Sequence, residues 1–266
     1  MNSRTFLFSA LALAALFMPV LLTAQEQPGN VPEARVPAPN PAAPLHAGPY
    51  WTKHDQQLLV DFGDLARFHD ADLALGPPVA GVSRVVFMGD SITDAWHLDV
   101  SFPGKPYINR GISGQTSPQM LVRFRQDVID LKPKVVIILA GTNDIAENTG
   151  PMTPEETEGN LMSMAQLARA NGIKVVLCSI LPSTDFWWHK GLHPAPKIVV
   201  LNKWIKTYAA REGYPYVDYY SAMADAEGGL PATLSKDGVH PSPAGYAVMA
   251  PLAEAGIEKA LNDTGH

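Results

Sequence analysis

Short apolar runs that alternate with helical patterns limit the possible folds of this chain more than any other feature. The runs cover residues 84–88, 107–109, 134–140, 173–180 and 215–218. Their apolar character predicts strands that are buried on both faces. Helical patterns lie between them and after the last one, at residues 116–131, 154–171, 196–211 and 242–262. Strands that alternate with helices of this length need crossover connections, so the sequence predicts a parallel sheet with helices on both faces.

The chain has the composition of one globular domain. Of its 266 residues, 46% are hydrophobic and 17% are charged, which is enough apolar material for one large core. The formal net charge is −6, and no run of Lys and Arg occurs. This argues against nucleic acid or an anionic membrane as the main partner. Cys178 is the only cysteine, and its apolar neighbours predict a buried, non-catalytic thiol.

The N-terminal region divides into three segments before the catalytic domain. Residues 1–24 carry Arg4 and a long apolar stretch, which predicts a signal peptide cleaved after Ala24 and export to the periplasm or the medium. An uncleaved membrane anchor is the alternative. Residues 25–45 are rich in Pro and Ala and predict an extended linker. We expect residues 46–80 to form a helical lead-in packed on the core, with Gly63 as a break, and residues 81–266 to form the catalytic domain.

Ser91 follows the first predicted strand, at the point where the chain turns into a helix. Ligands of parallel sheets bind at the carboxyl ends of the strands, so the position suits a nucleophile. A helix N-cap is an equally good interpretation of this serine when it is considered alone.

Asp237 and His240 lie three residues apart, just before the last predicted helix. A serine hydroxyl needs a base, and a neutral imidazole suits that role near neutral pH. A carboxylate then fixes the imidazole tautomer and stabilises the imidazolium. A metal-binding pair or a solvated turn are the alternatives for this spacing.

Two further loops at predicted strand ends carry candidate hydrogen-bond donors. Asn143 follows the third strand, and its side-chain amide can donate to the oxyanion of a tetrahedral intermediate. Gly111 and Gly114 follow the second strand, where glycine permits close backbone approach to a ligand, and the Gly114 N–H is a second candidate donor. An Asx-turn at Asn143 and ordinary turn glycines are the alternatives.

Taken together, these loops resemble the four sequence blocks of the SGNH (GDSL-like) hydrolases over about residues 84–260. The blocks are Gly89-Asp90-Ser91, Ile112-Ser113-Gly114, Gly141-Thr142-Asn143-Asp144 and Asp237-x-x-His240. The resemblance implies a flavodoxin-like three-layer α/β/α sandwich with a five-stranded parallel sheet. It also implies ester hydrolysis through an acyl-Ser91, no metal and no organic cofactor, and an oxyanion hole formed by the Ser91 and Gly114 N–H groups and Asn143. The first block reads GDSIT, like the lysophospholipase L1-like and platelet-activating-factor-acetylhydrolase-like branch, which leaves the substrate open.

An aromatic loop, Phe186-Trp187-Trp188-His189, follows the fourth strand and should overhang the site. Trp187, Trp188 and His189 are candidate substrate contacts, with Asp90 beside the serine as a further candidate. The loop can equally be a hydrophobic lid that anchors itself. Trp96 is expected to be packing and His97 to be exposed.

The preferred substrate is a short-chain ester, in particular an O-acetyl ester, on a carbohydrate or small alcohol. The predicted apolar helix faces look like core-facing stripes and not like a lipid-docking surface. Two alternatives are open: a lysophospholipase or thioesterase that acts on longer acyl chains, and a catalytically inactive carbohydrate-binding relative.

Overall fold

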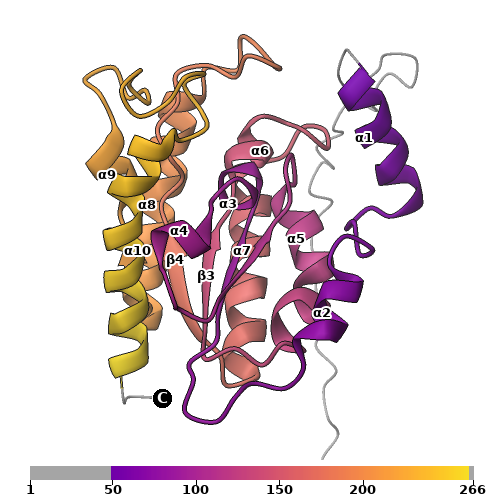
Figure 1. Cartoon of the computed structure of the whole chain (residues 1–266). Coiled ribbons are helices and arrows are strands. Elements are labelled where there is room, and N and C mark those ends of the chain that lie inside the picture. Colours follow the sequence, from indigo (N-terminus) through magenta and orange to yellow (C-terminus); the bar gives the residue numbers. More distant parts are fainter. Residues whose placement is uncertain (1–48, 264–266) are drawn as a thin grey trace, which may run out of the picture. The chain divides into compact units, whose positions relative to one another are not determined.

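The computed structural model describes residues 49–263 and has one five-stranded parallel sheet (Figure 1). The strands are β1 Val85–Gly89, β2 Tyr107–Gly111, β3 Val135–Leu139, β4 Lys174–Cys178 and β5 Tyr216–Val217. Their order is β2-β1-β3-β4-β5, and all neighbouring pairs are parallel. This is a flavodoxin-like order, so the predicted α/β fold is confirmed.

Pairing in the sheet aligns the strand ends that carry the candidate site. Gly89 at the end of β1 is paired with Gly111 of β2 on one side and with Leu139 of β3 on the other. The loops that follow these three strands therefore leave the sheet at the same level. Segments that contain the candidate nucleophile and both candidate oxyanion loops meet at one edge of the sheet.

Helices of very different lengths connect the strands. They are α1 Pro49–Val60, α2 His69–Leu75, α3 Ser91–Asp94, α4 Leu98–Ser101, α5 Ser117–Phe124, the π-helix η1 Arg125–Ile129, α6 Thr142–Ile145, α7 Pro154–Ala170, α8 Pro194–Glu212, α9 Tyr219–Met223 and α10 Pro243–Asn262. The predicted continuous helix over 116–131 is in fact α5 followed by one wider π turn. Within residues 49–263, no helix is both long and apolar enough to cross a membrane.

Local sequence signals explain where the long helices begin and end. Thr153 and Glu156 form a reciprocal capping box at the start of α7, which satisfies backbone N–H groups that have no partner within the helix. Ser242 accepts a hydrogen bond from the Gly245 N–H at the start of α10. Gly213 ends α8 in the left-handed conformation that glycine adopts without strain.

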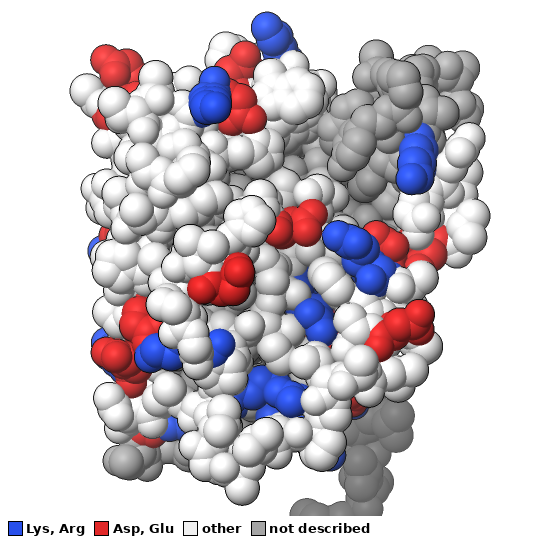
Figure 2. All heavy atoms as spheres, in the orientation of Figure 1, with Lys and Arg blue, Asp and Glu red and all other residues white. Residues whose placement is uncertain are grey.

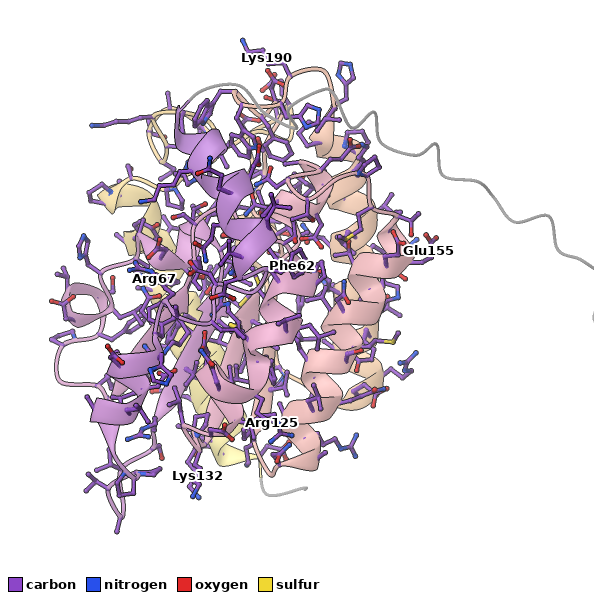
Figure 3. All side chains as sticks on the ribbon, turned by 90° about the vertical axis from the view of Figure 1, so that its right-hand side faces the viewer. Phe62, Arg67, Arg125, Lys132, Glu155 and Lys190 are labelled. Carbon is purple, nitrogen blue, oxygen red and sulfur yellow. The ribbon has the colours of Figure 1, made fainter. Side chains whose placement is uncertain are left out.

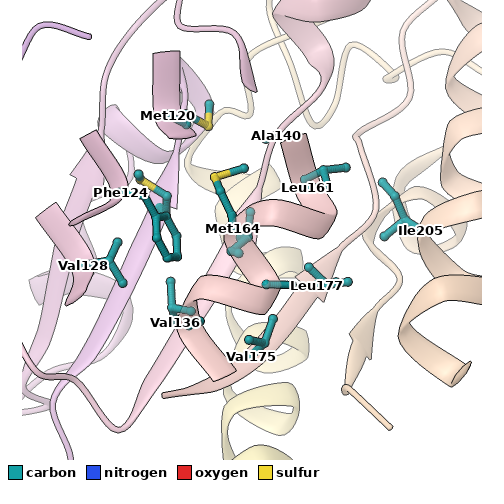
Figure 4. Packing of buried hydrophobic residues seen from close by; sticks show 14 of the residues in the cluster. Met120, Phe124, Val128, Val136, Ala140, Leu161, Met164, Val175, Leu177 and Ile205 are labelled. Carbon is teal, nitrogen blue, oxygen red and sulfur yellow. The ribbon is translucent and has the colours of Figure 1, made fainter. Parts of the chain in front are cut away.

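Two apolar layers cover the two faces of the sheet. Helices α5, α7 and α8 pack on one face, and α3, α4, α9 and α10 pack on the other. Figure 4 shows the first layer, where Phe124 and Met164 from the helices lie against Val136 and Leu177 from the strands. Neighbouring residues of each strand point to opposite layers, which is why the strands are apolar throughout.

The lead-in, residues 49–80, is attached to the rest of the domain largely by polar side chains. Side-chain amides of Gln115, Gln119 and Gln126 donate to the carbonyls of Gly63, Phe62 and Leu65 at 2.8, 2.9 and 2.6 Å. Leu59, which the helical pattern places in the expected apolar stripe, is 88% exposed. Figure 3 looks onto this segment and labels Phe62 and Arg67, between α1 and α2. Leu75 packs against the core cluster, so hydrogen bonds to turn carbonyls add to the apolar packing that we expected.

The remaining expectations concern the N-terminal segments, Trp96, His97 and the surface charge. The predicted signal peptide (1–24) and linker (25–45) lie outside the described residues. Trp96 is buried at 3% exposure and His97 is exposed, as expected. Acidic and basic side chains are interspersed on the face shown in Figure 2. That face carries no extended basic patch of the kind that nucleic acid needs.

Candidate active site

The serine hydroxyl at the start of α3 is not used as a helix cap. Asp90 takes that role, since its Oδ1 accepts a hydrogen bond from the Ile92 N–H at 2.9 Å. Ser91 Oγ instead lies 2.9 Å from Nε2 of His240, 149 residues further along the chain. The Ser91 hydroxyl therefore faces an imidazole and not the N-terminus of α3.

His240 is held from its other side by Asp237. The distance from His240 Nδ1 to Asp237 Oδ2 is 2.7 Å, and Asp237 Oδ1 accepts the backbone N–H groups of Val239 and His240. Partial burial raises the pKa of Asp237, but these hydrogen bonds outweigh burial and lower that pKa to about 2. A carboxylate at this position fixes the Nδ1–H tautomer and leaves Nε2 free to accept the serine proton. Among the described residues no cluster of three or more His, Cys, Asp or Glu side chains is arranged to hold a metal ion.

The candidate oxyanion donors lie around the same serine. Gly114 has a φ of 82°, a conformation that favours glycine. Within residues 49–263, neither its backbone N–H nor that of Ser91 donates to another protein group. Asn143 Nδ2 donates to the Gln115 carbonyl at 3.0 Å, which leaves the second hydrogen of that amide for another acceptor. Asn143 Oδ1 accepts from Asn148, and the Ile145 N–H donates to the Gly141 carbonyl, so Asn143 forms no Asx-turn.

The backbone at Gly111 packs closely against α3, whereas the sequence suggested a close approach to a ligand. A Cβ at this position would lie 2.1 Å from the Asp94 backbone nitrogen and 2.6 Å from the Thr93 carbonyl carbon. The end of β2 is thus pressed against α3, the helix that begins with Ser91. Asn109 strengthens this contact by donating to the Thr93 carbonyl at 2.6 Å.

An open pocket of about 300 Å³ joins these groups. Its lining residues are Ser91, Ser113, Gly114, Asn143, Asn148, Trp187, Trp188 and His240. Two of the four further candidates, Trp187 and Trp188, are in the lining, with the Trp188 ring centroid 6.3 Å from that of His240. Asp90 and His189 are not: Asp90 is fully buried beneath the serine, and His189 Nδ1 donates to the Ala146 carbonyl at 2.8 Å.

The aromatic loop contains an anchor as well as a wall. Phe186 is completely buried and packs with Ala146 and Val239, next to His240. Trp187 is 58% exposed, while Trp188 is half-buried and stacks on Phe186. Phe186 thus anchors the loop, while Trp187 and Trp188 line the pocket, where they stay candidate substrate contacts.

A model of the GDSL-like lipase/acylhydrolase family matches residues 87–248. The chain belongs to this family. The predicted SGNH (GDSL-like) membership is thus confirmed, and the chain is a carboxylic ester hydrolase.

Relatives of this GDSL-type esterase include named esterases. Esterase TesA of Pseudomonas aeruginosa is 30% identical over 178 residues, covering 61% of this chain and 82% of TesA. An acetylxylan esterase of Geobacillus stearothermophilus is 28% identical over 213 residues, covering 66% and 94% of the two chains. A solved GDSL-like lipase of Bacteroides thetaiotaomicron is 46% identical with a TM-score of 0.73, covering 75% of this chain and all of that one.

Burial gives the esterase an unusual carboxyl directly before its serine. Asp90 is fully buried, and among the described groups its Oδ2 has no hydrogen-bond partner. Desolvation raises the pKa of Asp90 to about 6, against the lowering effects of the Ile92 N–H and of His240. Asp90 is therefore a buried acid, directly before Ser91, whose pKa is raised by burial.

Sequence reasoning missed two buried residues that hold the esterase site together. Arg123 is completely buried, and it donates to the Gly89 carbonyl at 3.0 Å and to Gln115 Oε1 at 2.6 Å. It thereby ties the end of β1 to the Gly114 loop. Asn148 links the Gly114 loop to Asn143. Neither residue shows a signal in the sequence, because a lone Arg in a helix or a lone Asn in a loop is usually exposed.

Proposed function

We propose that the chain is an exported serine esterase that hydrolyses short-chain esters, O-acetyl groups on carbohydrates in particular, through an acyl-Ser91 intermediate. The observation that carries the proposal is the hydrogen-bonded line from Ser91 Oγ through His240 to Asp237, at 2.9 and 2.7 Å, at the floor of the pocket. Export rests on the predicted signal peptide at residues 1–24.

The geometry supports a two-step acyl transfer. His240 Nε2 takes the Ser91 proton as Oγ attacks the ester carbonyl, and Asp237 stabilises the imidazolium. The negative charge on the carbonyl oxygen is received by the Ser91 and Gly114 N–H groups and the Asn143 amide. His240 then gives its proton to the departing alcohol. Water, deprotonated by the same imidazole, attacks the acyl carbonyl. His240 then returns this proton to Ser91 Oγ as the acyl–oxygen bond breaks and the acid leaves.

Pocket size and lining favour a small acyl group on a sugar. A volume of about 300 Å³ lies at the lower end of the range for small-molecule sites. The exposed ring of Trp187 offers an apolar face of the kind on which a sugar ring stacks. Relatives named acetylxylan esterases support the same substrate class.

Substitution of the nucleophile is the first test. The Ser91→Ala variant should lose p-nitrophenyl acetate hydrolysis by about 10⁴-fold or more while its circular dichroism and unfolding midpoint stay those of the parent. A fluorophosphonate probe should label the parent and not the variant. If the folded variant turned over the ester at the parental rate, the proposed nucleophile would be wrong.

Substrate class is tested by a panel of esters. We expect kcat/KM to fall steadily from acetyl to octanoyl p-nitrophenyl esters, and acetylated xylo-oligosaccharides to release acetate. A rise of kcat/KM with chain length would instead indicate a lysophospholipase or thioesterase.

A further inference from the structure

Asn148 has a completely buried side chain that contacts Gly114 and Asn143, two of the residues proposed to supply oxyanion donors. Its Nδ2 donates to the Gly114 carbonyl and to Asn143 Oδ1, each at 3.0 Å. Its Oδ1 accepts the indole N–H of Trp188 at 2.9 Å. The side-chain amide thus has its oxygen and both N–H hydrogens paired, which fixes it in one orientation.

The indole N–H of Trp188 sets the direction of the two amides in turn. An indole nitrogen only donates, so the oxygen of Asn148 must face Trp188 and its nitrogen must face Asn143. Asn143 must then turn its oxygen toward Asn148, which leaves its nitrogen on the side of Gln115 and the pocket. A reversed Asn148 amide would place oxygen against oxygen at both Asn143 and Gly114.

The loop that carries Trp188 is itself fastened to the segment that carries Asn148. Phe186 packs on Ala146, and His189 Nδ1 donates to the Ala146 carbonyl at 2.8 Å. The Asn148 backbone N–H donates to the Asn143 carbonyl at 3.1 Å. These contacts hold the indole and both amides at fixed separations, as a preorganised site requires.

We propose that Asn148 is a positioning residue, oriented by the Trp188 N–H, which aims the Asn143 amide and the Gly114 loop at the oxyanion of the transition state. The proposal rests on the proposed function, because it presupposes an acyl transfer at Ser91. It gives Trp188 a role beyond that of a pocket wall: the same ring borders the substrate and fixes the donors.

The test compares steady-state kinetics of Trp188→Phe and Asn148→Asp with p-nitrophenyl acetate. Loss of one oxyanion donor lowers kcat by about 10²- to 10³-fold, so misdirection of the donors by Asn148→Asp should lower kcat by ~10- to 100-fold. Trp188→Phe keeps an aromatic ring and removes the N–H, and kcat should fall about 3- to 10-fold. KM should change less than about twofold in both, because the donors act mainly on the transition state.

A double-mutant cycle separates this role from general damage. With Asn148→Asp already present, Trp188→Phe should lower kcat no further, since the indole acts through that amide. Asn202→Asp is the matched control: Asn202 is another buried amide, and it bridges the N–H and carbonyl of Ile180. This control should lose stability and keep the parental kcat.

Distinct outcomes overturn the proposal and its premise. A rise in KM with an unchanged kcat in Trp188→Phe would make Trp188 a substrate contact only. A parental kcat in folded Asn148→Asp, or the same loss of kcat in Asn202→Asp, would remove the positioning role. If Ser91→Ala stayed active, the acyl transfer itself would be wrong, whatever the Asn148 variants did.

Discussion

Asp90 combines two features at the residue scale that seldom occur together. It caps α3 through Oδ1, which stabilises the turn that presents Ser91, and it is completely buried with Oδ2 unpaired within the described chain. An ionised carboxylate in such a place is costly. Since burial raises the pKa of Asp90 to about 6, ionisation of this group works against the folded state.

Asp90 should make the stability of the esterase depend on pH. Its folded-state pKa of about 6 lies above the unfolded value of 3.8, so its contribution is fully present below pH 4 and is lost as the pH rises through 6. The total loss is about 3 kcal/mol, from two pKa units at 1.4 kcal/mol each. Urea unfolding of the parent and of Asp90→Asn at pH 3 to 7 checks this. The parent should weaken by that amount relative to the variant, and a constant difference would contradict the assignment.

Sequence reasoning at this scale identified residues that carry reactive groups and missed those that position them. Ser91, Gly114 and Asn143 lie in short motifs after strand ends, and Asp237 and His240 lie in one before the last helix. The structure places four of them in the lining of one pocket, and Asp237 is bonded to His240. Asn148 was missed because its importance depends on Trp188, 40 residues away along the chain. Contacts between loops of that separation leave no periodic pattern in a single sequence.

At the scale of helices and strands, long or strongly apolar elements were predicted more accurately than short ones. The strands and the helices α7, α8 and α10 begin and end within a few residues of their predicted bounds, because buried runs and capping residues mark them. A turn into a helix was expected at Ser91, but the sequence did not predict that α3 ends at Asp94, and α6 was not predicted, because four residues are too few to show a period. The π turn of η1 follows α5 without any local signal that we recognise.

Close packing of β2 against α3 predicts that Gly111 tolerates no side chain. Its Cβ would meet backbone atoms of Asp94 and Thr93, which cannot move without shifting α3 and Ser91. We expect Gly111→Ala to cost about 2 to 3 kcal/mol and to lower kcat on p-nitrophenyl acetate at least tenfold. Chemical denaturation and steady-state kinetics measure the two effects.

Gly159 provides the matched glycine for this experiment. It lies inside α7, and no atom within 4 Å would meet its Cβ. Gly159→Ala should therefore stabilise the esterase by about 0.5 to 1 kcal/mol and leave kcat unchanged. Parental stability and kcat in Gly111→Ala would show that α3 can be displaced without loss.

For the molecule as a whole, one ion pair ties the lead-in to the edge of the sheet. Arg110 of β2 pairs with Asp72 of α2, and the guanidinium also lies 4.6 Å from the centroid of the Phe68 ring. The side chains of the pair are only 7% and 11% exposed. A charge left alone in such surroundings is strongly unfavourable.

Removal of one partner should therefore destabilise the esterase more than removal of both. We expect Asp72→Leu to cost about 3 to 5 kcal/mol, because Arg110 then remains buried and unpaired. The double variant Asp72→Leu/Arg110→Met should recover most of this loss, as urea unfolding can show. A double variant less stable than the single one would indicate that the pair is itself strongly stabilising.

The alignment of strand ends at one edge of the sheet has a consequence for how the esterase acquires activity. Ser91 and His240 are 149 residues apart, and the donors come from two further crossover units. Closing such long loops is slow, and parallel pairing cannot form from local contacts alone. Hydrolysis should therefore reappear only in the last phase of refolding from urea, after the helical circular dichroism signal. A turnover assay during refolding would then report when the native topology is complete.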